Sequence, residues 1–142
     1  MKKWMAIVMM ITALNAAHAA KQGDAAPTFE AQSTKGAVKL DNYKGKWLVL
    51  YFYPKADTPG CTKESCSLRD GYEQLQKAGA EILGVSLDTV EAQQKFKDKY
   101  KLPFDLVADT DKKVAKAYDA LMITGLMTSR VTYLIDPEGK IA

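Results

Sequence analysis

The sequence of 142 residues is poor in histidine: its one histidine is His18, close to the N-terminus. Cysteine proteases use a histidine to activate the thiol, and structural zinc sites are built from cysteine and histidine ligands. Without His18 in the mature chain, a Cys-His dyad and a zinc site of the Cys/His kind are both excluded. A helix terminus, an arginine or a lysine must then activate any reactive cysteine.

Strong charge of either sign is also missing. The full chain has a net charge of +3 at pH 7, and loss of Lys2 and Lys3 would leave 18 basic and 17 acidic side chains, a net charge of +1. Proteins that bind nucleic acids or anionic membranes through electrostatics carry a pronounced basic surface. The composition therefore gives no electrostatic reason to expect either partner.

The N-terminal 19 residues have the pattern of a secretory signal peptide. Lys2 and Lys3 form a basic region, residues 5–14 are apolar, and Ala17-His18-Ala19 fits an A-x-A cleavage site before Ala20. The apolar stretch is too short to cross a bilayer as a helix. No cysteine follows the cleavage site, so a lipid anchor is not indicated there. We expect an exported, periplasmic or extracytoplasmic protein, free of the membrane after cleavage, whose single domain comprises residues 20–142.

The most informative stretch lies between residues 47 and 66. Residues 47–53 (WLVLYFY) form a continuous apolar run that predicts a buried strand, which Pro54 ends because proline cannot donate to a strand ladder. Thr58 in N-cap position and Pro59 in the first helical position predict a helix start. Cys61 then falls in the first helical turn, where free backbone amides and the helix dipole stabilise a thiolate.

Strands and helices alternate through the rest of the chain, which predicts an α/β fold. Residues 20–36 show little periodicity and are expected to wrap the surface. The expected strands are 37–40, 47–53, 81–87, 104–108 and 130–136; the expected helices are 59–78, 89–101 and 114–121; 122–129 is an expected loop and 137–140 a hairpin turn. Gly79 and Gly84 match the glycine spacing of a phosphate-binding loop, but Val85 stands where that motif requires lysine.

Two cysteines, Cys61 and Cys66, are five residues apart. The cysteine count in an exported protein favours a structural disulfide. On an intact helix, however, positions i and i+5 are about 8–9 Å apart between Cα atoms, by helical geometry. A disulfide requires about 4.4–6.8 Å. A crosslink over so short a loop would contribute only about 2 kcal/mol while breaking a well-capped helix. The pair therefore favours a switch that is helical when reduced and unwound when oxidised.

The chain has two arginines, Arg69 and Arg130. Arg69 falls in the middle of the expected helix and is interpreted as a surface or salt-bridge residue. Arg130 opens the last expected strand. If that strand lies near the centre of a doubly wound sheet, its first residue would direct the guanidinium towards Cys61.

Several of these residues form a pattern that resembles the peroxiredoxins. The residues in question are 51–64 (YFYPKADTPGCTKE), Cys66, 68–70 (LRD) and 130–136 (RVTYLID). The similarity covers most of the chain from about Gly23. It is closest to the bacterioferritin comigratory protein, or peroxiredoxin Q, type, because of the second cysteine five residues after the first.

The resemblance implies a thioredoxin-like fold and thiol-dependent reduction of hydrogen peroxide and organic hydroperoxides. By position, Cys61 matches the peroxidatic cysteine, Cys66 the resolving cysteine, Thr58 the hydroxyl that orients peroxide, Pro54 the residue that shields the pocket, and Arg130 the guanidinium that stabilises the thiolate.

The resemblance also implies how the reaction is completed. A Cys61 sulfenic acid would condense with Cys66 to a disulfide, which an exported thioredoxin-like protein would reduce, without metal or organic cofactor. We expect a monomer or weak homodimer. The sequence ends at Ala142, before the C-terminal strand and helix that the family leads us to expect.

Two other functions fit the same residues. An exported dithiol–disulfide oxidoreductase acting on protein thiols is one, although such proteins usually have C-x-x-C rather than C-x-x-x-x-C spacing. A non-enzymatic domain whose cysteines form a structural crosslink is the other. Reaction with peroxide rather than with protein thiols would distinguish the peroxidase from the dithiol–disulfide oxidoreductase.

Overall fold

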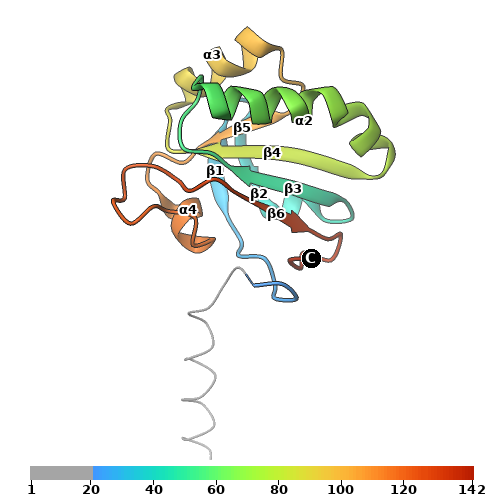
Figure 1. Ribbon diagram of the computed structural model, residues 1–142. Helices are drawn as coiled ribbons and strands as arrows, with labels where there is room; N and C mark the ends of the chain where they lie inside the picture. Colours follow the sequence, from blue (N-terminus) through green and yellow to red (C-terminus); the bar gives the residue numbers. More distant parts are fainter. Residues whose placement is uncertain (1–20) are drawn as a thin grey trace, which may run out of the picture.

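The computed structural model describes residues 21–142 of the chain. The expected signal peptide, residues 1–19, lies outside the described residues. The remainder is one α/β domain with helices on both faces of a single sheet (Figure 1). No helix within residues 21–142 is long and apolar enough to cross a membrane.

Six strands form the sheet, in the order β2-β1-β5-β4-β3-β6. The strands are β1 (Glu30–Ser33), β2 (Gly36–Lys39), β3 (Trp47–Phe52), β4 (Ala80–Ser86), β5 (Asp105–Ala108) and β6 (Val131–Ile135). The three central strands, β5, β4 and β3, are parallel, and β6 runs antiparallel to β3. This agrees with their sequences, since strands buried on both faces read as continuous apolar runs rather than alternating ones.

Two long helices connect the parallel strands. Helix α2 (Pro59–Lys77) follows β3 and helix α3 (Val90–Tyr100) follows β4. Thr58 is the extended N-cap residue of α2, as expected, and Gly79 adopts a φ of +84° just beyond its C-cap, where glycine costs least. The threonine that precedes α3 accepts a hydrogen bond from the amide of Ala92 at 3.2 Å.

The core has two halves, one on each face of the sheet. Tyr51 and Tyr53 point from β3 and its end towards α2 and α3, whereas Leu48, Leu50 and Phe52 point to the opposite face. Helix α4 (Lys113–Ala117) covers that second face together with residues near the N-terminus (Figure 1). Side chains alternate along a strand, so β3 contributes to both halves of the core. The loop that follows β3 therefore begins between the two halves.

Gly84 on β4 has a packing role rather than a role in phosphate binding. A Cβ atom there would lie 2.8 Å from Cζ of Tyr51 and 2.8 Å from Cδ2 of Leu106. Only a residue without a side chain lets the Tyr51 ring lie over the neighbouring strand at this point. The glycine thus fixes where the tyrosine lies beneath α2.

Three expectations about the fold were wrong. Residues 30–33 form β1, which pairs with β2 from Glu30↔Lys39 to Ser33↔Gly36. Three of its four residues are polar, and only Ser33 is buried, so the strand has no apolar pattern. Helix α4 ends at Ala117 rather than at 121, and Asp119 has a φ of +52°, which helices do not adopt. The last strand, β6, lies at the end of the sheet and not near its centre.

Candidate active site

Cys61 lies in the first turn of α2, directly after the end of β3. Its side chain is only 1% exposed and carries a free thiol. Ser65, one turn further on, is fully buried, and Leu68, Tyr72 and Leu75 continue the same packed face, as the helical spacing predicts. The amide of Thr62 already bonds to the carbonyl of Thr58 at 2.8 Å, which leaves the amides of residues 60 and 61 as the free donors of the first turn.

Arg130 brings a positive charge to this cysteine. Its Nη2 atom lies 3.2 Å from Sγ of Cys61, as expected from the sequence. The position of β6 at the sheet edge does not prevent this contact, because β6 is antiparallel to β3 and pairs Val131 with Phe52. The first residues of β6 therefore lie at the carboxyl end of β3, where α2 begins.

Glu64 is the second partner of the guanidinium. Nη1 of Arg130 lies 3.1 Å from Oε1 of Glu64, so the arginine bridges the thiol and a carboxylate on successive turns of α2. Burial raises the pKa of Glu64, while Arg130 opposes that rise. The pKa of Arg130 is raised, chiefly by its hydrogen bond to Cys61. Gly60 gives the guanidinium room, since a Cβ at that position would lie 3.1 Å from Nη2.

Thr58 and Pro54 belong to the loop that joins β3 to α2. The Thr58 hydroxyl donates to the carbonyl of Lys55 at 2.8 Å and makes no side-chain cap bond to the helix. Thr58 and Pro54 are both half-buried. The amide of Ala56 donates to Oδ2 of Asp88 at 2.8 Å, which fastens this loop to the segment after β4.

A buried network of hydrogen bonds between the sheet and α3 supports the loop after β3 and the first turns of α2. Ser86 donates to Asp88 at 2.6 Å and accepts from the Gln93 amide at 2.9 Å, and Gln93 accepts from the hydroxyl of Tyr53. Tyr53 stacks on Tyr51, whose ring centroid is 5.3 Å away. The Tyr51 hydroxyl in turn lies 2.9 Å from Oγ of Ser65, one turn beyond Cys61. Every polar group in this chain of contacts has a partner, which makes it a rigid support.

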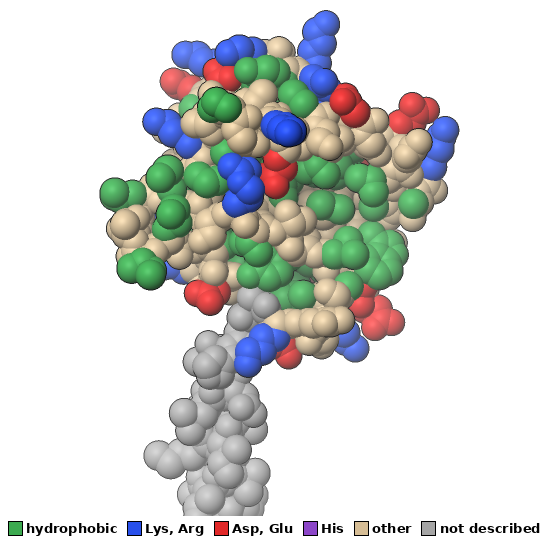
Figure 2. All heavy atoms as spheres, in the orientation of Figure 1, with side chains coloured by type: hydrophobic (Ala, Val, Ile, Leu, Met, Phe, Trp, Pro, Cys, Tyr) green, Lys and Arg blue, Asp and Glu red, His purple; other side chains and the backbone are tan. Residues whose placement is uncertain are grey.

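Thr128 is a site residue that the sequence did not single out. Its hydroxyl, fully buried, donates to the carbonyl of Tyr53, and the amide of Ser129 donates to the carbonyl of Ala120 at 2.7 Å. These bonds hold the chain just before Arg130 against the end of β3. The loop that precedes Thr128 exposes apolar side chains, led by Ile123 at 107% and Leu126 at 74% exposure, on the face shown in Figure 2. A lone threonine in an irregular segment carries no sequence signal.

Cys66 is half-buried and free, and it lies in the second turn of the intact helix α2. Cys61 and Cys66 are therefore on the continuous helix that separates their Cα atoms by about 8–9 Å in regular geometry. Arg69 follows one turn later. Its Nε atom lies 3.1 Å from Asp70, the expected salt bridge, and its Nη1 atom also donates to the carbonyl of Tyr100 at 2.7 Å.

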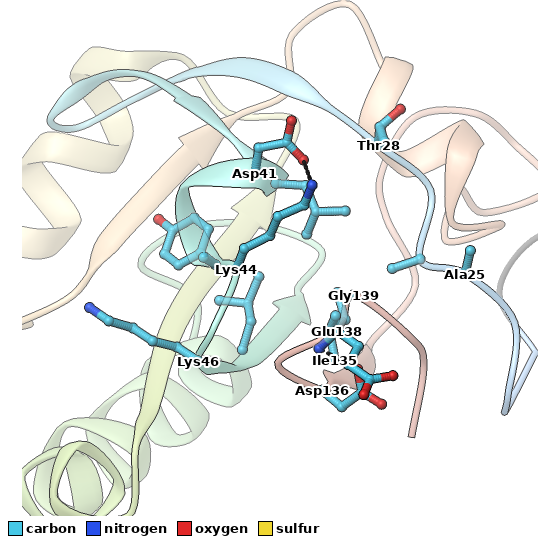
Figure 3. Close-up of a pocket in the computed structure, with 13 residues that line it drawn as sticks. Ala25, Thr28, Asp41, Lys44, Lys46, Ile135, Asp136, Glu138 and Gly139 are labelled. Atoms are coloured by element: carbon cyan, nitrogen blue, oxygen red, sulfur yellow. Dashed lines mark hydrogen bonds and ion pairs between the residues drawn. The ribbon is translucent and has the colours of Figure 1, made fainter.

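A pocket of about 190 Å³ lies elsewhere, at the opposite end of β3 (Figure 3). Its floor is apolar and includes Leu48 and Ile135, and its rim carries charged side chains, among them Asp41 and Lys44, which lie 3.5 Å apart. Neither cysteine lines this pocket. The reactive groups are thus gathered at the carboxyl end of β3, where open α/β sheets place their ligands.

Comparison with known proteins identifies the class to which this fold and site correspond. Residues 22–142 match the model of the AhpC/TSA family. A putative peroxiredoxin bcp from Coxiella burnetii is 46% identical over 127 residues, which cover 84% of this chain and 84% of the relative. The chain therefore belongs to the AhpC/TSA family.

Solved structures agree with this assignment. A cysteine-to-serine mutant of PrxQ from Xylella fastidiosa superimposes with a TM-score of 0.81 at 31% identity, covering 87% of this chain and 84% of the other. A bacterioferritin comigratory protein from Xanthomonas campestris, studied for alkyl peroxide reduction, gives a TM-score of 0.76 at 36% identity, covering 80% and 77%. The fold is the thioredoxin-like fold of peroxiredoxins, which are thiol peroxidases, and the relatives are of the bacterioferritin comigratory protein or peroxiredoxin Q type.

Proposed function

We propose that the protein reduces hydrogen peroxide and organic hydroperoxides with Cys61 as the attacking thiolate. The observation that carries the proposal is the 3.2 Å contact between Nη2 of Arg130 and Sγ of Cys61 in the first turn of a helix. A fixed positive charge and free first-turn amides both favour a thiolate. Reduction of alkyl peroxides, attributed to the related Xanthomonas campestris protein, supports organic hydroperoxides as substrates.

In the first step the Cys61 thiolate attacks one peroxide oxygen. The S–O bond forms as the O–O bond breaks, and the other oxygen takes a proton and leaves as water or an alcohol. Negative charge grows on that leaving oxygen, and preorganised donors around it lower the barrier. Arg130, the Thr58 hydroxyl and the first-turn amides are the donors assigned to this role, while Pro54 shields the thiolate. The sulfur is left as a sulfenic acid.

In the second step Cys66 resolves the sulfenic acid. Its sulfur attacks Sγ of Cys61, so that the S–S bond forms, the S–O bond breaks and the oxygen leaves as water. The helix must open for this step, because a disulfide requires a Cα separation of about 4.4–6.8 Å. An external thioredoxin-like dithiol protein then reduces the disulfide by two thiol exchanges. Resolution by Cys66 therefore couples each turnover to an unwinding of α2.

Titration of the reduced protein with hydrogen peroxide tests this proposal. We expect loss of one equivalent of peroxide within seconds and, by peptide mass spectrometry, a Cys61–Cys66 disulfide as the product. Slow oxidation without selectivity for Cys61 would contradict it. The comparisons give no support to the alternative, an exported dithiol–disulfide oxidoreductase; faster reaction with a protein disulfide than with peroxide would favour that activity.

Export is part of the same proposal and rests on the signal pattern of residues 1–19. An exported enzyme requires a thioredoxin-like reductant in the same compartment, and the mature chain would act there as a monomer or weak homodimer. Expression of the full sequence in a bacterium with a periplasm should yield a chain whose intact mass begins at Ala20. A cytoplasmic product that retains Met1 would contradict the assignment.

A further inference from the structure

The segment of α2 that contains both cysteines is fastened at its two ends to the same place. Upstream, the Asp57 carboxylate accepts hydrogen bonds from Nζ of Lys99 at 3.0 and 3.1 Å and from the Tyr100 hydroxyl at 2.9 Å. Downstream, Nη1 of Arg69 donates to the carbonyl of Tyr100 at 2.7 Å. Lys99 and Tyr100 are adjacent residues at the C-terminal end of α3.

We propose that Lys99 and Tyr100 form a clamp that confines the unwinding of α2 during disulfide formation to the residues between Asp57 and Arg69. In this role they are positioning residues, since they act on the cysteines only through the two ends of the segment. The inference rests on the proposed function, because it assumes that Cys66 resolves the Cys61 sulfenic acid.

The contacts along α2 divide the helix at Arg69. Beyond that residue the helix is tied to the sheet, since the Tyr72 hydroxyl donates to Glu81 at 3.0 Å and the Gln76 amide donates to the same carboxylate at 3.2 Å. Before it, the polar ties are those of Cys61 and Glu64 to Arg130 and that of Ser65 to Tyr51. Oxidation of Cys61 directly alters its contact with Arg130. The N-terminal half of α2, residues 59–68, is thus the part that the reaction itself can release.

The upstream anchor holds a residue in an uncommon backbone conformation. Asp57 has a φ of +59°, in the left-handed region, which few residues other than glycine adopt, although aspartate does so more readily than most. Such a conformation persists where surrounding contacts enforce it. The hydrogen bonds from Lys99 and Tyr100 supply that enforcement and lower the pKa of the Asp57 carboxyl. They therefore set the direction in which the chain enters Thr58 and the first turn.

The clamp is itself attached to the core. The Tyr100 ring packs edge-on against Phe96, with centroids 5.5 Å apart, and Phe96 is 1% exposed. Since α3 is fixed in this way, both ends of the cysteine segment stay at fixed points while the helix between them opens. After reduction of the disulfide, the same fixed points favour return to the helix. The ends of the segment are already held in place, so refolding the helix does not cost the entropy of bringing them together.

Hydrogen–deuterium exchange of the full chain, reduced and disulfide-bonded, tests the clamp. In the wild type, amides of residues 62–68, the first of which bonds to the carbonyl of Thr58, should lose protection on oxidation, while those of 70–77 keep it. In Arg69→Met the loss should spread into residues 70–73, with exchange faster by about fivefold, the factor expected for one lost hydrogen bond. In Tyr100→Phe combined with Lys99→Met, the loss should spread upstream to the amide of Ala56, which donates to Asp88.

Lys97→Met is the matched control, because it removes another ion pair of α3, that with Asp105 at 2.9 Å, and touches neither anchor. Its exchange boundary should match that of the wild type. Each variant is compared with its own reduced form, so that a general loss of stability cancels. Unchanged boundaries in both clamp variants would overturn the inference, as would loss of protection through Lys77 in the wild type. Absence of a Cys61–Cys66 disulfide in the wild type would instead overturn the proposed function.

Discussion

Replacing Cys61 with serine will abolish peroxide consumption, lowering the rate by at least about 10³-fold, because a buried hydroxyl is not ionised at neutral pH and is a poor nucleophile. The variant should fold, since serine is close to cysteine in shape and can still face the guanidinium of Arg130. We expect the free energy of unfolding to change by no more than about 1.5 kcal/mol. Peroxide consumption and urea denaturation of the same sample measure both quantities.

Cys66→Ser is the matched control for that experiment. It changes the other thiol of the same helix, leaves Cys61 and Arg130 in contact, and should consume one equivalent of peroxide at the wild-type rate. Turnover should then stop, with the sulfenic acid trapped or oxidised further. Retention of peroxide consumption in Cys61→Ser would refute the assignment of the nucleophile, and a slow first equivalent in Cys66→Ser would refute the division of roles between the two cysteines.

Replacing Arg130 with methionine will lower the second-order rate constant for hydrogen peroxide by about 10²–10³-fold, the range found when a preorganised donor to a developing charge is removed. Methionine keeps much of the length of the arginine stem and lacks the charge and the donors. Two effects combine here: Sγ of Cys61 loses its cationic neighbour at 3.2 Å, and the leaving oxygen loses a donor. Stopped-flow measurement of the first oxidation step isolates this change from resolution.

Lys63→Met provides the control for loss of charge alone. Lys63 lies on the same turns of α2 but is exposed, so its removal should alter the rate by less than about twofold, as expected for a screened surface charge. Arg130→Lys should recover only part of the rate, because an ammonium lacks the planar fork that reaches Cys61 and Glu64 together. A wild-type rate in Arg130→Met would mean that the helix terminus alone activates Cys61.

Local patterns predicted the centre of the molecule well. The apolar run of β3, the N-cap position of Thr58 and Pro59 at the first position of α2 together placed Cys61 in a first helical turn, and the structure confirms that placement. These signals succeed because each depends on neighbours within a few residues: periodic burial, the fixed φ of proline and the unsatisfied amides of a helix start.

Features that depend on contacts between distant parts of the chain could not be predicted from the sequence. Strand β1 is held by pairing with β2 and, at Ser33, with β5, and so it carries no apolar pattern of its own. The edge position of β6 follows from pairing partners that sequence does not reveal. The roles of Thr128 and Tyr100 could be recognised only in the structure, where Thr128 bonds to the end of β3 and Tyr100 bonds to Arg69 within α2 and to Asp57 before it. Their residue types are common, and only their positions distinguish them.

The antiparallel return of β6 also bears on how the enzyme is made. Cys61 and Arg130 are 69 residues apart in the chain, and their contact requires β6 to have paired with β3. During synthesis, Cys61 therefore leaves the ribosome well before Arg130. Until nearly the whole domain has assembled, Sγ of Cys61 lacks its contact with the guanidinium of Arg130. On the proposed function, the thiol would therefore reach full reactivity only when the fold is complete.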